Sequence, residues 1–196
     1  MSPPMDTYQR ILDSAKELIY AKSYADVGVA AICEKAKVQK GSFYHHFSSK
    51  QELTLAVIDA YYTDLKAVLI EQAFNSGLPP LERFAKFAEL SIDMQIRLHK
   101  QTGHVYGCPL GNLGTEMSTQ DEAIRCKLDG KFASLQKLFR ATLQEAVDRG
   151  DVKGINVDIT AQAMLAMFEG CLLLAKTHND PLILRQLLPA AAQLRL

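Results

Sequence analysis

The chain reads Val29-Ala-Ala-Ile-Cys-Glu-Lys-Ala36, then Lys37-Val-Gln39, then Lys40-Gly-Ser-Phe-Tyr-His-His-Phe47. Two short helical patterns are thus separated by only three residues, which is the spacing of a helix-turn-helix motif. The positions expected to face inward are apolar, namely Ile32, Ala36, Val38, Phe43 and Phe47. Phe43 and Phe47 are one helical turn apart, so we expect them to anchor the second helix of the motif to the helix that opens the chain.

The rest of the chain is also predicted to be helical, because apolar residues recur at helical spacing and no stretch shows sustained period-two alternation. Ser49 with Glu52 three residues later is a capping pattern and marks the start of one long helix. Residues 101–118 contain four glycines and a proline, so we expect this stretch to be irregular. The expected helices run from Tyr8 to Lys22, from Ser49 to Phe74, from Leu81 to Lys100, from Gln120 to Arg149 and from Asp158 to Lys176, with a last one ending near Arg195.

The predicted fold is therefore all-α, with a three-helix helix-turn-helix domain at residues 1–52 and a helical bundle at residues 53–196. The 196 residues are 48% hydrophobic and 22% charged, which excludes the disordered and fibrous classes. Lys and Arg number 22, and Asp and Glu also number 22, so the chain is not coated with basic patches. Residues 1–50 nevertheless carry seven basic and five acidic side chains, a small asymmetry that points to the N-terminal domain.

Cysteine usage and the apolar segments indicate the compartment. The four cysteines lie far apart and form no Cys-x-x-Cys pair, which favours a reducing environment. The N-terminal sequence shows no basic stretch followed by an apolar core, so no signal peptide is expected. The most apolar window, Ile159 to Ala175, contains polar and charged residues, and we interpret it as a core or interface helix and not as a membrane span. These features predict a cytoplasmic protein with no membrane partner.

The outward face of the second helix of the motif carries amide, ammonium, hydroxyl, phenol and imidazole groups, from Gln39, Lys40, Ser42, Tyr44, His45 and His46. No carboxylate lies between Gln39 and Lys50 to repel phosphates. This chemistry fits the major groove of DNA, and Lys50 at the start of the next helix can add a contact to the DNA backbone. The alternative is that three short helices only cap a helical bundle, because generic helix-turn-helix spacing is common.

The segment Val38-Gln-Lys-Gly-Ser-Phe-Tyr-His-His-Phe-Ser-Ser-Lys-Gln-Glu-Leu53 resembles the signature of the TetR family of bacterial transcriptional regulators. That signature reads approximately Gly-Val-Ser-x-Gly-Ser/Thr-hydrophobe-Tyr-x-x-Phe-x-x-Lys-x-x-Leu. The resemblance covers residues 8–55, extending back through Ile32, Tyr24, Ala15 and Ile11. It implies a dimeric repressor whose recognition helix reads a palindromic DNA operator and whose C-terminal helices bind a small-molecule effector.

The resemblance also assigns roles to individual residues, with Phe43 and Phe47 in the core and Lys40, Ser42, Tyr44, His45 and Lys50 on DNA. The chain departs from the family pattern in two places. Val27-Gly28 stands where the family usually has a Ser or Thr that caps the first helix of the motif and contacts phosphate. Lys37 replaces the turn glycine and is expected to adopt a positive φ at a cost of ~1 kcal/mol. Its side chain offers a phosphate contact in exchange, so the candidate DNA-binding residues are Lys37, Gln39, Lys40, Ser42, Tyr44, His45 and Lys50.

The C-terminal helices carry the features of a dimer interface. Asp158 to Lys176 is apolar nearly all round, and such a helix has to be covered on every face. The last helix has the same character, so we expect core on one side and a second subunit on the other, as in the four-helix dimer interface usual in the family. The alternative is an all-core helix in a monomer. Glu169 is the one carboxylate in this apolar surface, and we expect it to form a structural pair or to bind a group of the ligand.

Residues 101–118 form a second candidate site, because an irregular segment in a helical body is a place where an effector can bind and shift helices. Gly107-Cys108, with Leu113 five residues after the cysteine, resembles the TetR branch that contains electrophile- and redox-responsive repressors. The resemblance implies that Cys108 is a sensing thiol whose alkylation or oxidation releases DNA. The alternative is that Cys108 is a small buried hydrophobe.

The candidate effector-binding residues are Phe87, Met94, His104, Cys108, Asn112, Met164, Phe168 and Glu169, although Met and aromatic residues at helical spacing more often form plain core. The spacing of His99, His104 and Cys108 does not fit a usual metal site, so no metal is expected. No cofactor is predicted either. The chain shows no Ser/His/Asp set and no phosphate-cradling glycine loop, so no enzymatic activity is expected.

The sequence thus predicts a TetR-type repressor that binds a palindromic operator as a homodimer. A small-molecule effector bound in the C-terminal domain releases it from DNA, with modification of Cys108 as one route. Two rival hypotheses stay open at this point. One is a helical ligand-binding or enzymatic dimer that binds no DNA, and the other is a thiol sensor without a small-molecule pocket.

Overall fold

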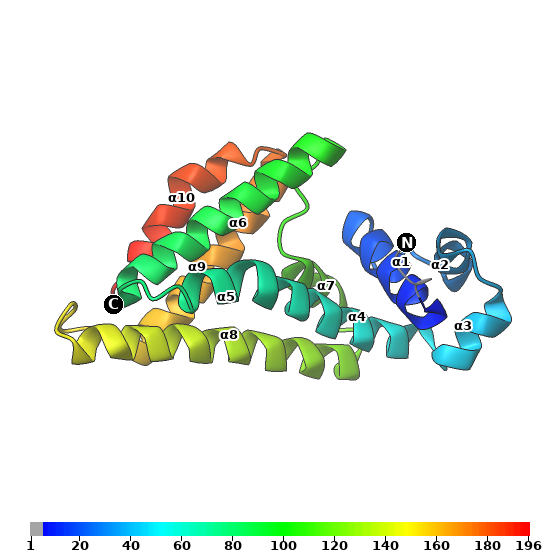
Figure 1. The fold of residues 1–196 in the computed structure, drawn as a ribbon, viewed down its shortest axis with the longest axis horizontal. Coiled ribbons are helices and arrows are strands. Elements are labelled where there is room, and N and C mark those ends of the chain that lie inside the picture. The colour runs from blue at the N-terminus through cyan, green and yellow to red at the C-terminus, as the bar shows by residue number, and fades with distance from the viewer. Residues whose placement is uncertain (1–5) are drawn as a thin grey trace. The chain divides into compact units, whose positions relative to one another are not determined.

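A computed structural model describes residues 6–196, and these residues form helices joined by short loops, with no strand among them (Figure 1). The predicted all-α fold is confirmed. The helices are α1 (Thr7–Ala21), α2 (Val29–Ala36), α3 (Lys40–His46), α4 (Lys50–Leu65), the π-helical segment η1 (Lys66–Ile70), α5 (Glu71–Phe74), α6 (Pro80–Thr102), α7 (Pro109–Met117), α8 (Glu122–Asp148), α9 (Val157–His178) and α10 (Leu182–Gln193).

The chain divides into two compact units. The first unit contains the chain up to Thr63 together with Pro109–Asp129, and the second contains Asp64–Cys108 and Gly130–Leu196. The first unit therefore holds the helix-turn-helix and also α7, which comes from much later in the sequence. The predicted domain boundary between residues 52 and 53 stays a prediction.

In the first unit, α1 is amphipathic and buries one face, with Ile11 and Ala15 fully inaccessible to solvent. Phe43 and Phe47 are also buried, at 0% and 2% exposure, which confirms that they anchor the motif. The ring of Tyr8 on α1 stacks against Phe47 with their centroids 4.9 Å apart. These contacts fix α3 against α1 and leave the opposite side of α3 to solvent.

The turn between α2 and α3 confirms the expected backbone strain at Lys37. This residue ends α2 in the left-handed region, with φ 55° and ψ 48°. The turn is closed by the backbone N–H of Val38, which donates to the carbonyl of Cys33 at 3.0 Å. Helices commonly end this way with glycine, which has no Cβ to clash in this conformation.

Replacement of Lys37 by glycine is therefore expected to raise the free energy of unfolding by about 0.5–1 kcal/mol. The relief of the left-handed strain outweighs the larger entropy of glycine in the unfolded chain. Urea denaturation measures the change. Ala31→Gly is the matched control, because Ala31 is exposed within the same helix and glycine there should destabilise by about 1 kcal/mol. A Lys37→Gly protein no more stable than the wild type would contradict the assignment of strain.

The start of α4 differs in one detail from the predicted capping box. The Ser49 hydroxyl accepts the backbone N–H of Glu52 at 3.0 Å, as expected. The Glu52 carboxylate, however, accepts from both the N–H and the hydroxyl of Ser48, one residue earlier than predicted. These hydrogen bonds, that from the Ser48 side chain foremost, lower the pKa of Glu52. The helix that was expected to be continuous to Phe74 is also interrupted by the π-helical segment η1.

The prediction that residues 101–118 are wholly irregular is wrong. Within it, residues 103–108 and Ser118 lie outside helices, and Pro109 begins α7, which ends at Met117. Proline suits the first turn of a helix, since its missing N–H would have no helical partner there. The helix then buries Leu110, Leu113 and Met117, which recur at helical spacing. This burial outweighs the low helix propensity of the two glycines within α7.

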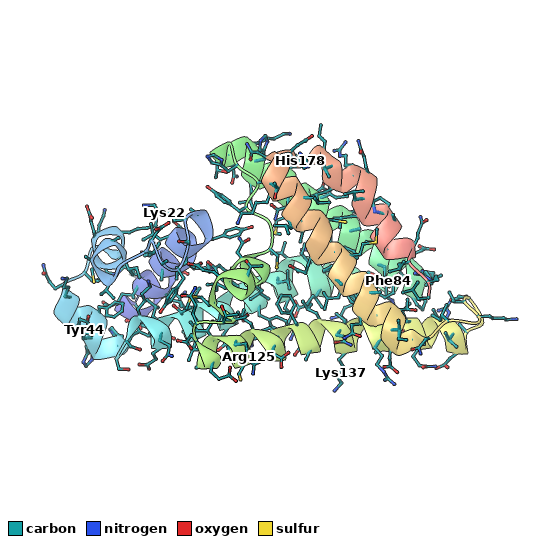
Figure 2. All side chains as sticks on the ribbon, turned by 180° about the vertical axis from the view of Figure 1, so that it is seen from behind. Lys22, Tyr44, Phe84, Arg125, Lys137 and His178 are labelled. Carbon is teal, nitrogen blue, oxygen red and sulfur yellow. The ribbon has the colours of Figure 1, made fainter. Side chains whose placement is uncertain are left out.

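The core of the second unit is a cluster of five phenylalanine rings from α5, α6, α8 and α9, namely Phe74, Phe84, Phe87, Phe139 and Phe168. Phe139 lies at its centre, with its ring centroid 5.3–5.9 Å from the other four. Figure 2 marks Phe84 within this unit. Helix α10 packs against both α6 and α9, and the three run side by side (Figure 1).

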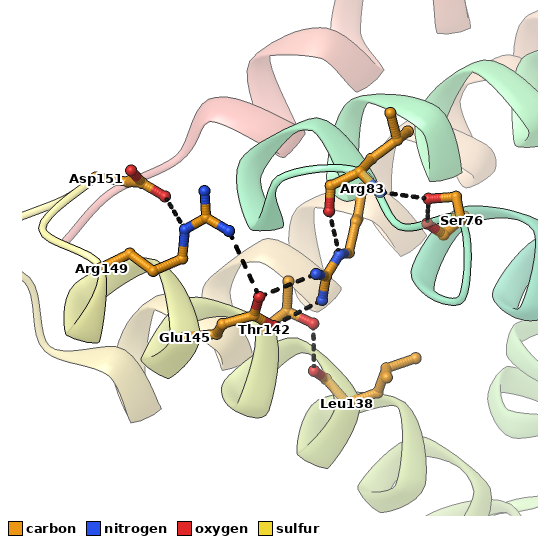
Figure 3. A network of polar contacts seen from close by, with 9 residues as sticks. Ser76, Arg83, Leu138, Thr142, Glu145, Arg149 and Asp151 are labelled. Carbon is orange, nitrogen blue, oxygen red and sulfur yellow. Dashed lines mark hydrogen bonds and ion pairs between the residues drawn. The ribbon is translucent and has the colours of Figure 1, made fainter.

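A polar network ties the start of α6 to the end of α8 (Figure 3). The Arg83 guanidinium makes a bidentate ion pair with Glu145, at 2.7 and 2.9 Å, and donates to the carbonyl of Leu78 at 2.7 Å. Arg149 lies 3.1 Å from the Asp151 carboxylate and 4.0 Å from that of Glu145. Paired guanidinium and carboxylate forks of this kind fix direction as well as distance.

Helix α9 buries only one face, which includes Met164, Phe168 and Cys171. Its other face exposes large apolar side chains, with Ile159 53%, Leu173 57% and Leu174 47% accessible. Helix α10 exposes Leu182 in the same way. By length and composition α9 is apolar enough to cross a membrane, but helices of soluble proteins pass the same test, so this is weak support for a membrane span.

Candidate nucleic-acid interface and effector segment

The candidate interface is the side of α3 that faces solvent. Gln39, Lys40, Tyr44 and His45 are exposed, and Ser42 is partly exposed. Tyr44, marked in Figure 2, is 56% accessible although it is a large aromatic residue. Its ring meets the buried Phe43 edge-on at 5.1 Å, so the position of the side chain is set by the core of the motif.

Lys37 extends this surface, since it is exposed in the turn that precedes α3. Between Lys37 and His46 the exposed groups are cationic or neutral, and no carboxylate lies among them. A surface of this kind accepts phosphate oxygens and offers donors and acceptors to base edges.

Lys50 differs from the other candidates because its ammonium is already engaged by the protein. Its Nζ donates to the backbone carbonyl of Tyr24 and lies 3.8 Å from the centre of the Tyr24 ring. Burial lowers the pKa of Lys50, and the nearby Glu116 carboxylate opposes this shift. The sequence placed Lys50 correctly at the start of α4 but gave no indication of this intramolecular contact.

Two contacts between distant parts of the sequence were missed altogether. The Glu116 carboxylate on α7 accepts the backbone N–H groups of Tyr24 and Ala25, at 2.9 and 2.8 Å. The Gln51 amide donates to Asp121 at 2.6 Å, and hydrogen bonds from the Ile124 backbone and Gln51 lower the pKa of Asp121. The partners are separated by 70 or more residues, so no local spacing could have revealed them.

The second candidate site is the segment 103–108, which amide side chains from α6 and the end of α9 hold in place. The buried Gln95 side chain donates to the carbonyl of Gly107 at 3.0 Å and accepts the N–H of the same residue at 3.3 Å. Asn179 accepts the N–H of Val105 at 2.9 Å and donates to the carbonyl of Gly103 at 3.0 Å. In the sequence, the only indication of this role for Gln95 is that it is a polar amide in the mostly apolar stripe of α6.

Cys108 ends this segment and forms a hydrogen bond with the Glu169 carboxylate of α9. Burial raises the pKa of Glu169, and the Cys108 hydrogen bond opposes that shift. All four cysteines are free thiols, of which Cys33 and Cys171 are buried, Cys126 is exposed and Cys108 is partly exposed. The structure therefore gives Glu169 a partner within its own chain and places Cys108 at intermediate depth.

The other predicted effector residues lie at different depths and belong to different units. Phe87, Met164 and Phe168 are buried in the core of the second unit, and Met94 is partly exposed on α6. His104 is exposed, with its ring 6.1 Å from that of Tyr106. Asn112 lies on α7 and so belongs to the first unit.

A groove of about 590 Å³ lies between α6 and α10 and is lined by none of the predicted effector residues. Its walls include Leu81, Ala85, Ile92, Arg185 and Pro189. Among residues 6–196, no group of three or more His, Cys, Asp or Glu side chains converges as metal ligands would.

Comparisons with known proteins cover nearly the whole chain. Residues 11–57 match the family described as bacterial regulatory proteins, tetR family, and residues 80–191 match the family described as tetracyclin repressor-like, C-terminal domain. The transcriptional regulator AcuR of Cereibacter sphaeroides is 35% identical over 176 residues, which cover 89% of this chain and 78% of that protein.

Solved structures give the same result. The crystal structure of regulatory protein TetR from Rhodobacter sphaeroides aligns with a TM-score of 0.86 at 31% identity, covering 97% of this chain and 99% of that one. The repressor NemR of Escherichia coli K12 is 23% identical over 176 residues, which cover 89% of this chain and 86% of that protein. The crystal structure of reduced E. coli NemR has the same fold, with a TM-score of 0.80 at 21% identity over 97% of this chain and 98% of that one.

Proposed function

Because this chain belongs to the TetR family of bacterial transcriptional regulators, we propose that it is a repressor that binds a palindromic operator as a homodimer. In this proposal a small-molecule effector bound in the C-terminal domain releases it from DNA. Members of the family are transcriptional regulators and not enzymes; they bind DNA operators and small-molecule effectors, typically as dimers. The rival hypothesis of an enzyme is therefore excluded.

The exposed, carboxylate-free side of α3 is the observation that carries DNA binding. In the proposed complex Gln39, Lys40, Ser42, Tyr44 and His45 enter the major groove, and Lys37 contacts phosphate from the preceding turn. Phe43 beneath them holds the helix in place. Two such helices, one from each subunit, have to reach major grooves about 34–36 Å apart, so a change in their separation weakens binding.

The operator is found by selecting bound duplexes from fragmented genomic DNA of the source organism. A variant that combines Lys40→Ala with Tyr44→Ala serves as the matched control, because it removes two exposed groups and leaves the buried core of the motif untouched. We expect a palindromic sequence to be enriched by the wild type and not by the variant. Failure of the wild type to enrich any sequence at low salt would count against the repressor and in favour of a helical dimer that binds no DNA.

The homodimer is proposed from the exposed apolar side chains of α9 and α10. Ile159, Leu173, Leu174 and Leu182 are each about half accessible in the single chain, and a group of large apolar side chains exposed on two neighbouring helices marks an interaction surface. A second copy of the same two helices would cover them in an isologous interface. Because a second subunit would cover the apolar face of α9, this helix needs no membrane around it, and we propose that the protein is cytoplasmic.

Modification of Cys108 is the proposed route for an electrophilic effector. Cys108 is partly exposed, and the relative E. coli NemR has a structure determined in a reduced form. An electron-poor alkene would add at Cys108, with the sulfur bonding to one alkene carbon and the thiol proton ending on the other. The bulkier side chain would displace Cys108 from Glu169 and disturb the segment that Gln95 holds.

N-ethylmaleimide provides the test of this route, because it is such an alkene. We expect it to lower the operator affinity of the wild type at least ~10-fold, through a conformational coupling of about 1.4 kcal/mol. The Cys108→Ser protein should keep its affinity, whereas Cys126→Ser, which removes the exposed thiol, should respond like the wild type. Equal losses in the Cys108→Ser and wild-type proteins would rule out Cys108 as the sensor. Loss of operator affinity caused by a reversible ligand that does not alkylate thiols would instead favour a non-covalent effector pocket.

A further inference from the structure

The loop between α1 and α2 is bound from two sides by side chains of other helices. Lys50, at the start of α4, donates to the carbonyl of Tyr24. Glu116, on α7, accepts the N–H of Tyr24 at 2.9 Å and the N–H of Ala25 at 2.8 Å. One cation and one carboxylate thus satisfy three backbone groups of the same two-residue segment.

These contacts are charge-assisted, and hydrogen bonds of this class are about twice as strong as those between neutral groups. The Tyr24 ring also faces the Lys50 ammonium at 3.8 Å, which adds a cation–π contact. Nearby, Gln51 on α4 and Asp121, which follows α7, are joined by a 2.6 Å hydrogen bond. The loop, the start of α4 and α7 therefore form one connected polar cluster.

The position of this loop matters because it leads directly into the first helix of the helix-turn-helix. Helix α2 begins after Gly28, which has no side chain to cap it. Lys50 and Glu116 instead hold the chain just before it, through the backbone of Tyr24 and Ala25. The placement of α2, and of α3 packed against it, then depends on residues outside the motif.

We propose that Glu116 and Lys50 are positioning residues that hold the Tyr24–Ala25 loop, and with it the recognition helix, in the arrangement that binds DNA. Lys50 acts through the loop and makes no phosphate contact of its own. Because α7 starts at Pro109, directly after Cys108, a displacement at Cys108 reaches the loop through Glu116. The inference deepens the proposed function and rests on it for its consequence in DNA binding.

Amide hydrogen exchange measured by NMR tests, without any DNA, whether Glu116 holds the Tyr24–Ala25 loop. In Glu116→Ala we expect the N–H groups of Tyr24 and Ala25 to exchange at least ~10-fold faster than in the wild type, since each loses its acceptor. Glu122→Ala is the matched control, because its carboxylate lies in the same unit but binds Arg125. Unchanged exchange at both amides in Glu116→Ala would overturn the proposal.

The salt dependence of DNA binding separates a positioning lysine from a phosphate contact. Each phosphate contact contributes about 0.9 to the slope of log affinity against log salt. We expect Lys50→Met to lower affinity about 10-fold and to leave the slope unchanged, whereas Lys40→Met should reduce the slope by about 0.9. A reduction of about 0.9 with Lys50→Met as well would overturn the positioning role. If the wild type bound no DNA at all, the proposed function would fail. The exchange experiment would still show whether Glu116 holds the Tyr24–Ala25 loop.

The connection through α7 has its own readout. In a Cys126→Ser background, alkylation of Cys108 with N-ethylmaleimide is expected to speed the exchange of the Tyr24 and Ala25 amides at least ~10-fold. The same treatment of a protein that also carries Cys108→Ser should have no effect. Unaltered exchange after complete alkylation of Cys108 would show that α7 does not transmit the change to the loop.

Discussion

Replacement of Leu173 by glutamate is expected to convert the protein to a monomer and to lower its operator affinity by about 100-fold or more. Leu173 is 57% accessible in the single chain and lies on the exposed apolar face of α9. In the proposed homodimer this position is covered, and an unpaired carboxylate there would lose its hydration without compensation. A monomer engages only one half-site, so the gain from joining two half-sites, about 10²–10⁴ in affinity, is lost.

Analytical ultracentrifugation gives the oligomeric state, and titration of a labelled operator gives the affinity. Ala141→Glu is the matched control, because it places the same charge at an exposed position of α8. We expect this control to stay dimeric and to bind DNA like the wild type. A Leu173→Glu protein that sediments as a dimer would refute the proposed interface. Circular dichroism confirms that the variant chain is still folded.

Truncation of Phe139 to alanine is expected to destabilise the protein by about 3–5 kcal/mol. Phe139 is inaccessible to solvent and is surrounded by Phe74, Phe84, Phe87 and Phe168. Removal of the ring takes away its apolar burial and leaves a cavity that four rigid rings cannot close. Since the net stability of a typical domain is about 5–15 kcal/mol, this loss is a large fraction of the total.

Urea denaturation measures this loss as a lower midpoint at an unchanged slope. Phe132→Ala, on the same helix but partly exposed, is the control, and we expect it to cost less than half as much. Equal losses at the two positions would show that the ring cluster has no special role in the core.

Sequence patterns located most of the helices because each carries its own start signal and apolar spacing. The prediction for α2 matches the observed helix residue for residue, and α6 begins at Pro80, one residue before the predicted start at Leu81. The burial of Phe43 followed from its spacing with Phe47. Such features depend on residues within about two turns of each other, and the sequence alone contains that information.

The features that were missed depend on contacts between distant residues. Helix α7 forms despite its two glycines because Leu110, Leu113 and Met117 are buried. Local helix propensity does not include the free energy of tertiary burial. The same holds for the binding of Glu116 to the Tyr24–Ala25 loop. At the candidate interface the exposed side of α3 was predictable from periodicity, whereas the engagement of Lys50 by Tyr24 was not.

The π-helical segment Lys66–Ile70 amounts to one surplus residue in an otherwise regular helix. Leu69 and Ile70 at the end of this segment and Ala73 and Phe74 in α5 are all buried, so one face of the helix stays buried through the wider turn. A lineage that deleted one residue here would recover an ordinary α-helix with the same positions facing inward. This stretch is therefore where we expect the chain to tolerate the deletion of one residue with the least change in the core.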